Sequence, residues 1–388
     1  MPVKNRFAEL YDDITAWRRD FHMHPEILFE THRTSATVAE KLRSFGCDEV
    51  VEGIGRTGVV GVIKGKTQAS GKVIGLRADM DALPIHEQTG VEYASKTPGA
   101  MHACGHDGHT AMLLGAARYL AETRNFDGTC VVIFQPAEEG GGGGKEMCDD
   151  GMMDRWGIQE VYGMHNWPGM PTGSFGIRTG PFFAATDLLD IEIEGLGGHA
   201  AKPNETIDTT VVAAHIVTAL QTIASRNADP IGNIVVSITS FETSSKAFNV
   251  IPQKVQMYGT VRTLSNDLRD LAEKRVTEIC EGMAKTFGAV ARVNYKRNYP
   301  VMVNHPEQTE FAADVAKGIS GQCDEAPLVM GGEDFAFMLE ERPGAYILMG
   351  NGEDGAMVHH PLYNFNDEAI PVGCSWFAEV VEQRMPAA

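Results

Sequence analysis

The sequence predicts an α/β protein in which a smaller α+β domain is inserted into a larger domain with a mostly parallel sheet. Between residues 72 and 164, short apolar segments alternate with a helix-forming segment, which is typical of βαβ units. From about residue 184 the predicted order becomes β-α-β-β-α-β, the ferredoxin-like arrangement. We therefore expect the larger domain in residues 1–183 and 296–388, and the inserted domain in residues 184–295.

The elements of the larger domain follow from apolar runs and helical periodicity. Residues 72–78 are predicted to form a buried strand that ends at Asp79. A helix with one apolar face is predicted over residues 108–124. Two more apolar strands are predicted at residues 129–134 and 158–164.

The inserted domain begins with a strand that has one face in solvent. Leu189, Ile191 and Ile193 alternate with acidic residues, which is the pattern of a half-buried strand. The elements that follow are a helix at about 206–225, strands at 232–241 and 254–262, a helix at 265–287 and a strand at 289–297. Beyond these elements, from about residue 299, the chain returns to an α/β pattern.

Composition and charge narrow the class of protein. The chain has 388 residues, 43% of them hydrophobic, so we expect two domains with sizeable cores and exclude a disordered chain. The formal net charge of -19 disfavours nucleic acid and membranes as partners. No apolar run is long enough to predict a transmembrane helix, and the charged N-terminal segment lacks the apolar core of a signal peptide. A cytoplasmic location is the default expectation.

Seven cysteines are scattered along the chain, an odd number that argues against a disulfide framework and for reduced thiols. Cys104 differs from the others because a single glycine separates it from His106. A thiolate and an imidazole at this spacing can bind one cation, and the glycine permits the bend. The other cysteines are expected to be packing residues: Cys47, Cys130, Cys148, Cys280, Cys323 and Cys374.

Potential ligands fall in four groups where predicted strands end, the edge at which ligands gather in α/β sheets. A single buried histidine or cysteine is most often a packing residue, so each group alone is weak evidence. Together, imidazole, thiolate and carboxylate donors indicate a site for Zn²⁺, Ni²⁺, Co²⁺ or Mn²⁺ rather than Ca²⁺. The groups are Asp79 with Asp81, Cys104 with His106, Glu138 with Glu139, and His165, and a fifth candidate near the C-terminus is His359 with His360.

The adjacent carboxylates Glu138 and Glu139 indicate a division of roles. One can bind metal while its neighbour holds a water molecule and carries its proton, which is general acid–base work. The alternative is a solvated acidic turn before the glycine run 140–144. That run lacks the Lys-Ser/Thr ending of a P-loop and the spacing of a dinucleotide site.

Taken in order, these motifs resemble the M20 metallopeptidase family in its amidohydrolase branch. This branch contains hippurate hydrolase, bacterial aminoacylases and plant auxin-conjugate hydrolases. The resemblance covers nearly the whole chain and implies a metal-dependent catalytic domain with an inserted lid or dimerisation domain. It rests on RADMDALP, HACGHDGH, QPAEEGGGG, GMHNWP, GLGGHAAKP, NVIP, GGEDFAFM and HHPLYNFND.

The resemblance also implies roles for single residues of the larger domain. Glu138 matches the general base. Asp81 matches the aspartate that supports the metal site, with Asp79 as a close rival. The wider family has a histidine in place of Asp79 and an aspartate in place of Cys104, so the cysteine places this chain in the amidohydrolase branch. Five positions match the metal ligands, the last with His360 as the fallback: Cys104, His106, Glu139, His165 and His359.

Three residues of the inserted domain match positions that act on the substrate. His199 matches a lid histidine that steadies the oxyanion and often enters the partner subunit's site, which implies a homodimer or a higher homo-oligomer. Asn249 and Arg262 match positions that help hold the substrate. The remaining histidines are expected to be structural or to support the site: His22, His24, His32, His86, His102, His109, His215 and His305.

The implied activity is hydrolysis of small N-acyl-L-amino acids at two divalent metal ions per subunit. Glu138 would take a proton from the attacking water and return it to the leaving amine, while His199 would steady the oxyanion. Three alternatives stay open: a dipeptidase of the same family, a carbamoyl-amino acid hydrolase, and a non-catalytic metal-dependent binding protein. The carbamoyl hydrolases lack the Cys104-Gly-His106 pattern, and simple binding does not need a base at Glu138.

Overall fold

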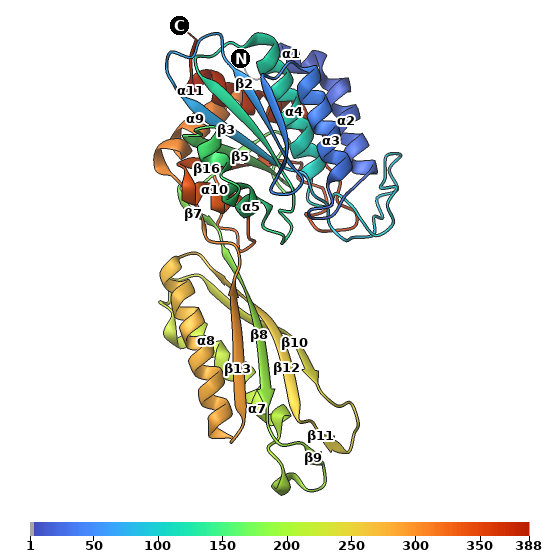
Figure 1. Ribbon diagram of the computed structural model, residues 1–388, viewed down its shortest axis with the longest axis vertical. Helices are drawn as coiled ribbons and strands as arrows, with labels where there is room; N and C mark the ends of the chain where they lie inside the picture. The colour runs from blue at the N-terminus through green and yellow to red at the C-terminus, as the bar shows by residue number, and fades with distance from the viewer. Residues whose placement is uncertain (1–3, 388) are drawn as a thin grey trace. The chain divides into compact units, whose positions relative to one another are not determined.

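The structure, a computed structural model, describes residues 4–387. The contacts between its residues divide the chain into two compact units. Figure 1 shows the chain coloured by residue number. None of the helices in this range combines the length and the apolar character needed to cross a membrane. The first unit contains the chain up to Gly180, Val303–Pro327 and the chain from Asp334 onward, and the second contains Pro181–Met302 and Leu328–Glu333.

The first unit is built on an eight-stranded sheet. In spatial order its strands are β1 (Glu49–Ile54), β2 (Gly58–Lys64), β4 (Thr129–Gln135), β3 (Val73–Asp79), β5 (Glu160–Trp167), β16 (Gly344–Gly350), β6 (Phe175–Ile177) and β15 (Asp324–Glu325). The four central strands β4, β3, β5 and β16 run parallel, whereas β1, β2 and β6 are joined by antiparallel pairs. β16 is buried along its whole length, as expected of a parallel strand covered on both faces. The predicted mostly parallel sheet is confirmed.

Helices cover both faces of this sheet (Figure 1). They are α1 (Asn5–Glu9), α2 (Tyr11–Met23), α3 (His32–Ser44), α4 (His106–Thr123), α5 (Gly143–Asp149), α6 (Met152–Arg155), α9 (Pro306–Ser320), α10 (Phe335–Glu341) and α11 (Ile370–Arg384), with the short turn η3 (Asp367–Ala369) before the last. α4 packs against β3, α2 and α11, and most of its residues are buried. The helix predicted over residues 108–124 therefore exists and begins two residues earlier, at His106.

Parallel strands bring the predicted ligand groups to one edge of the sheet. β3 ends at Asp79, β4 ends at Gln135, and His165 lies two residues before the end of β5. Because β4, β3 and β5 are parallel neighbours, their carboxyl ends lie side by side. The chain that follows each strand starts from this edge.

The second unit is a four-stranded antiparallel sheet with two helices. Its elements are β8 (Ala185–Glu194), α7 (Thr209–Thr222), β10 (Ile234–Thr243), β12 (Lys254–Thr263), α8 (Asn266–Thr286) and β13 (Val290–Arg297). The spatial order β10-β12-β8-β13 confirms the ferredoxin-like prediction. Leu189, Ile191 and Ile193 of β8 are buried in a core that they share with α7 and α8.

The short elements complete the description of the chain. Strand β9 (Gly198–His199) pairs with β11 (Val250–Ile251), close to the start of β12. Asp208 caps α7 by accepting hydrogen bonds from the backbone N–H groups of Thr210 and Val211. The remaining elements are a two-stranded pair of β7 (Gly180–Phe183) and β14 (Met302–Asn304), the turn η1 (Pro203–Glu205) and the π-turn η2 (Ile223–Asn227).

Candidate metal centre

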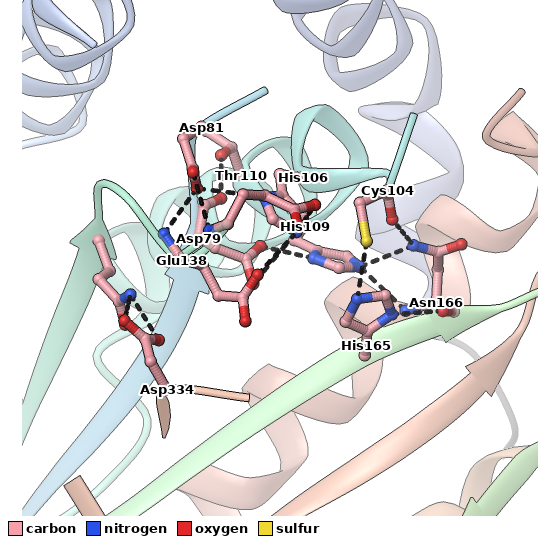
Figure 2. A network of polar contacts seen from close by, with 12 residues as sticks. Asp79, Asp81, Cys104, His106, His109, Thr110, Glu138, His165, Asn166 and Asp334 are labelled. Atoms are coloured by element: carbon pink, nitrogen blue, oxygen red, sulfur yellow. Dashed lines mark hydrogen bonds and ion pairs between the residues drawn. The ribbon is translucent and has the colours of Figure 1, made fainter. Parts of the chain in front are cut away.

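Asp79, the last residue of β3, is a buried carboxylate whose two oxygens are both bound by side chains. Figure 2 shows Asp79 next to His109. Arg77 Nη1 donates to Oδ2 at 2.7 Å, and His109 Nδ1 donates to Oδ1 at 2.6 Å. Burial opposes ionisation, but His106, Arg77 and His109 hold the pKa of Asp79 well below its ordinary value. Because protein partners already use both oxygens, Asp79 is suited to support the site rather than to bind metal.

Asp81 organises two other segments. Its Oδ1 accepts a hydrogen bond from the backbone N–H of Glu138 at 3.0 Å, and its Oδ2 accepts one from the N–H of Glu139 at 3.1 Å. The same Oδ1 lies 3.3 Å from His106 Nδ1. One buried carboxylate thus holds the glutamate pair and an imidazole together, which is the contact pattern of a supporting aspartate.

Cys104 and His106 lie on either side of Gly105, where the chain turns into α4. Gly105 has a φ of 90°, and a Cβ at this position would lie 2.3 Å from Asn166 Nδ2 and 2.4 Å from Tyr363 Oη. Both the left-handed backbone and the available space therefore require glycine. The turn leaves His106 fully buried, with its Nε2 at 3.7 Å from Asp79 Oδ2 and without a hydrogen-bond partner among residues 4–387.

Glu138 and Glu139 follow a tight turn after β4. Ala137, directly before them, has a φ of 55°, which is uncommon for a residue other than glycine. Glu138 Oε2 and Glu139 Oε1 each lie 4.0 Å from His106 Nε2. The turn and the two hydrogen bonds to Asp81 therefore direct both carboxylates toward the same imidazole.

His165 reaches the cluster from β5. Its Nδ1 donates to the backbone carbonyl of Asn166 at 2.5 Å, so its other nitrogen carries the lone pair. That Nε2 lies 3.4 Å from Cys104 Sγ. Burial, and then the neighbouring His109, lower the pKa of His165 well below its ordinary value, which keeps the ring neutral.

His359 rather than His360 faces these residues. His359 has a φ of 67°, its backbone N–H donates to the Ala103 carbonyl at 2.7 Å, and its Nε2 lies 3.4 Å from Glu139 Oε1. Both histidines are exposed, but His360 Nδ1 accepts a hydrogen bond from the backbone N–H of Leu362 at 3.1 Å. Because the backbone of His359 is left-handed, the side chains of His359 and His360 point in different directions.

The assembled donors fit divalent transition-metal ions. Cys104 lies with His106 and His165, and also with Glu139 and His359, in groups whose donor atoms are within 4.8 Å of one another. Each of the three imidazoles turns its Nε2 toward the cluster, and in His106 and His165 the Nδ1 meets a carboxylate or carbonyl oxygen. This arrangement, together with the unbonded and buried His106 Nε2, is typical of metal-binding histidines.

The charge of the cluster also fits a cation. Burial, followed by the negative charges of Glu139, Glu138 and Asp79, raises the pKa of the Cys104 thiol well above its ordinary value. Although burial opposes it, Asp79 and then Asp81 and Glu139 raise the pKa of His106 to about 10. The shift of His106, which occurs against the effect of burial, reflects the negative carboxylates around it, whose charge a divalent cation would neutralise.

His199, Asn249 and Arg262 lie in the second unit, and its fold does not bring all three together. His199 pairs with Val250, and the Asn249 carbonyl accepts from the N–H of Ala200 at 2.9 Å, so His199 and Asn249 are neighbours. Arg262 lies near the far end of β12, which begins just after β11. The eight steps along the strand from Lys254 to Arg262 span about 26 Å at roughly 3.3 Å per residue.

Several supporting residues have no predicted role. Arg77 donates to Gln135 Oε1 at 2.8 Å and to Asp334 Oδ1 at 2.9 Å, and the Gly144 N–H donates to Asp334 Oδ2 at 2.8 Å. These contacts tie β3, β4 and the start of α5 and α10 together. The sequence signal that could have identified these residues is their position next to the predicted ligands, within the motifs already singled out. The same holds for Asn166 and Tyr363, whereas His109 was expected to be structural or to support the site.

Known proteins resemble this chain over nearly its full length. It is 41% identical over 376 residues to a hippurate hydrolase of Campylobacter jejuni, covering 96% of each chain. It is 40% identical over 380 residues to thermostable carboxypeptidase 2 of Saccharolobus solfataricus, covering 96% of this chain and 95% of the relative. A solved structure, described as a dinuclear metal binding peptidase from the M20 family of Bacillus subtilis, matches with a TM-score of 0.85, 34% identity and coverage of 98% and 100%.

The fold, the donor set and these relatives define a metal-binding hydrolase. The chain belongs to peptidase family M20/M25/M40, whose family model matches residues 75–383. The resemblance drawn from the motifs is therefore confirmed at the level of the family.

Proposed function

We propose that this hydrolase cleaves the amide bond of N-acyl-L-amino acids and releases a carboxylate and a free amino acid. The observation that carries the proposal is the cluster of Cys104, three imidazole Nε2 atoms and Glu139, with a second carboxylate, Glu138, beside it. The relative named hippurate hydrolase supports the substrate class, because hippurate is an N-acyl amino acid. In this proposal the first unit is the catalytic domain and the second is a lid or dimerisation domain.

The proposed metal site takes its donors from four chain segments. Two divalent ions, of Mn, Zn, Ni or Co, would supply Lewis acidity toward water and toward the amide carbonyl. Asp81 keeps His106 and the glutamate pair in place, and Asp79 holds α4 through His109. The proposed ligands are Cys104, His106, Glu139, His165 and His359.

Glu138 is the proposed general acid and base. Its carboxylate accepts a proton from the water whose oxygen attacks the carbonyl carbon. The new C–O bond forms first, and the C–N bond then breaks. Glu138 returns the proton to the nitrogen, which leaves as the amine of the amino acid. Its backbone is fixed by Asp81, so the side chain needs little rearrangement to do this.

The proposed roles of the second unit require a second copy of the chain. His199 would donate a hydrogen bond to the oxyanion, while Asn249 and Arg262 would hold the substrate. Because β12 separates Arg262 from the other two by about 26 Å, at roughly 3.3 Å per residue, a small substrate cannot touch all three from one copy. We therefore propose a homodimer or a higher homo-oligomer in which at least one of these residues comes from the partner.

A hydrolysis panel tests the substrate class. It crosses acetyl, benzoyl, long-chain acyl and indole-acetyl groups with several amino acids, in the presence of Mn²⁺, Zn²⁺, Ni²⁺ or Co²⁺. We expect N-acyl-amino acids to be cleaved faster than dipeptides and N-carbamoyl-amino acids of matched side chain.

The relative named carboxypeptidase makes a peptide the second candidate substrate. Faster cleavage of the dipeptides would therefore replace the acyl-amino acid proposal with a peptidase. Absence of turnover in fully metal-loaded protein would favour a binding protein instead.

A further inference from the structure

Asn166 is a buried residue beside His165, and protein partners surround all of its polar groups. Its backbone N–H donates to His109 Nε2 at 2.9 Å, and its backbone carbonyl accepts from His165 Nδ1 at 2.5 Å. Its side-chain Nδ2 donates to the Cys104 carbonyl at 2.6 Å, and its Oδ1 accepts from the Tyr363 hydroxyl at 2.7 Å. Asn166 is therefore the hub of a fully bonded network.

Beyond β5, which carries Asn166 and His165, these contacts lead to two other segments of the proposed metal site. The Cys104 carbonyl belongs to a proposed ligand directly. His109 lies in the first turn of α4, which His106 begins, and Tyr363 lies four residues after His359. Asn166 thus links segments that are far apart in the sequence and that meet only in the folded protein. Figure 2 shows its contacts with Cys104 and His109.

The contact with His109 also extends the network to β3. Because the Asn166 N–H donates to His109 Nε2, the proton of this ring is on Nδ1, where it is donated to Asp79 Oδ1 at 2.6 Å. Asp79 is in turn bound by Arg77 at 2.7 Å. A chain of three hydrogen bonds therefore runs from Asn166 to Arg77.

The side chain of Asn166 is tightly packed against its neighbours. A Cβ on Gly105 would lie 2.3 Å from Asn166 Nδ2, so the amide contacts the backbone between Cys104 and His106 directly. The site needs a donor toward the Cys104 carbonyl and an acceptor toward the Tyr363 hydroxyl on one short planar group. Asparagine supplies both, aspartate lacks the donor, and leucine lacks both.

We infer that Asn166 is the positioning residue of the metal centre, setting the mutual placement of the segments that carry Cys104, His165 and His359. The inference rests on the proposed function, because it concerns the proposed ligands. Asn166 does not bind metal in this scheme, and it acts by reducing the rearrangement that the donors need when an ion binds.

The test is titration of metal-free protein with Co²⁺, followed by the thiolate-to-metal absorption that Cys104 would produce. A Cys104→Ser variant checks that the band comes from this cysteine. For Asn166→Ala we expect the Co²⁺ dissociation constant to increase by about 10- to 100-fold, the usual effect of losing a partner that orients metal ligands. For Tyr363→Phe, which removes one hydrogen bond, we expect an increase of about three- to tenfold.

Asn304 provides a matched control in the same unit. It is equally buried, its Nδ2 donates to the carbonyls of Arg178 and Tyr346 at 2.9 Å, and its Oδ1 accepts from the Tyr346 N–H at 2.7 Å. Asn304→Ala should lower the thermal stability of the metal-free protein as Asn166→Ala does, yet leave the Co²⁺ dissociation constant unchanged. This separates positioning of ligands from general support of the fold.

Each result leads to a decision. Wild-type Co²⁺ affinity in Asn166→Ala, or an equal loss in Asn304→Ala, overturns the inference and leaves the proposed function intact. If Asn166→Ala does not fold, Tyr363→Phe decides, and wild-type affinity in that variant overturns the inference. Wild-type protein that binds no Co²⁺ overturns the proposed function itself.

Discussion

The candidate residues of the two units differ in how firmly the fold holds them. In the first unit Cys104, His106 and His165 are buried, and hydrogen bonds orient the His165 ring and hold the backbone of Cys104. In the second unit His199 and Asn249 are exposed, and Arg262 lies at the other end of the sheet. The first unit therefore builds its cluster by itself, whereas the contribution of the second depends on association or closure.

Removal of metal should have the largest effect. We expect a chelator to abolish hydrolysis and Mn²⁺, Zn²⁺, Ni²⁺ or Co²⁺ to restore it, because the donor cluster of the first unit is the proposed source of Lewis acidity. The measurement is the hydrolysis rate of N-acyl-amino acids with the metal content determined on the same sample. Full activity in metal-free protein would mean that the cluster is not the reaction centre.

Substitution of Glu138 should affect kcat, whereas substitution of the neighbouring Glu139 should affect metal binding. Glu138→Gln should lower kcat by about 10²- to 10⁴-fold, the range for a general acid–base group, with metal content near that of the wild type. Glu139→Gln should instead lower metal occupancy, because this carboxylate faces His359 and His106. Metal analysis and kinetics on both variants provide the check, and reversed phenotypes would exchange the two roles.

Replacement of His199 should lower the catalytic rate without changing the metal content. His199→Ala should lower kcat by about 10²- to 10³-fold, the range for one oxyanion donor, because an exposed residue of the second unit does not support the cluster. Metal content should stay unchanged. A wild-type rate would make His199 an ordinary turn residue of the second unit.

Mixing variants tests whether His199 acts in the partner subunit. Heterodimers of His199→Ala with Glu138→Gln contain one intact site if each site borrows His199 from its partner. We expect partial activity to return in these heterodimers, measured against each inactive parent. Verified heterodimers without activity would show that His199 serves its own chain.

The smallest expected effect tests whether the metal affinity of the first unit is independent of the stability of the second unit. Asp208→Ala removes the cap of α7 and should lower the free energy of unfolding of the second unit by about 1 kcal/mol. Metal affinity, measured by Co²⁺ titration, should not change. Glu205→Ala, which breaks an exposed ion pair with Lys202, serves as the control and should alter stability by less than about 0.5 kcal/mol. A large loss of metal affinity in Asp208→Ala would mean that the first unit's cluster depends on the second.

Local patterns in the sequence are sufficient for β3, β4, β5 and α4 of the first unit and for the four strands and two helices of the ferredoxin-like second unit. The alternation of Leu189, Ile191 and Ile193 predicts β8 because side chains in a strand alternate between faces, and the structure buries these three. No element is predicted before residue 72, although the buried apolar run of β2, Gly58–Lys64, carries a clear strand signal. β1 carries two glutamates and is largely exposed, so no apolar run marks it as a strand.

The sequence by itself determined the residue types of the site and the places of Asp79, Glu138 and His165 at or near the carboxyl ends of strands, because parallel strands present these ends at one edge. Cys104 and His106 were also expected where a strand ends, but they lie where a long loop meets α4. Only the tertiary structure decided which partners meet there. It directs His359 rather than His360 to Glu139 through a left-handed turn, gives Asp81 the contacts to His106 and the glutamates, and makes Asn166 the link between Cys104 and Tyr363. These contacts join residues up to 220 positions apart, as in the pair of Glu139 and His359, and no local pattern encodes contacts that form only when distant segments pack.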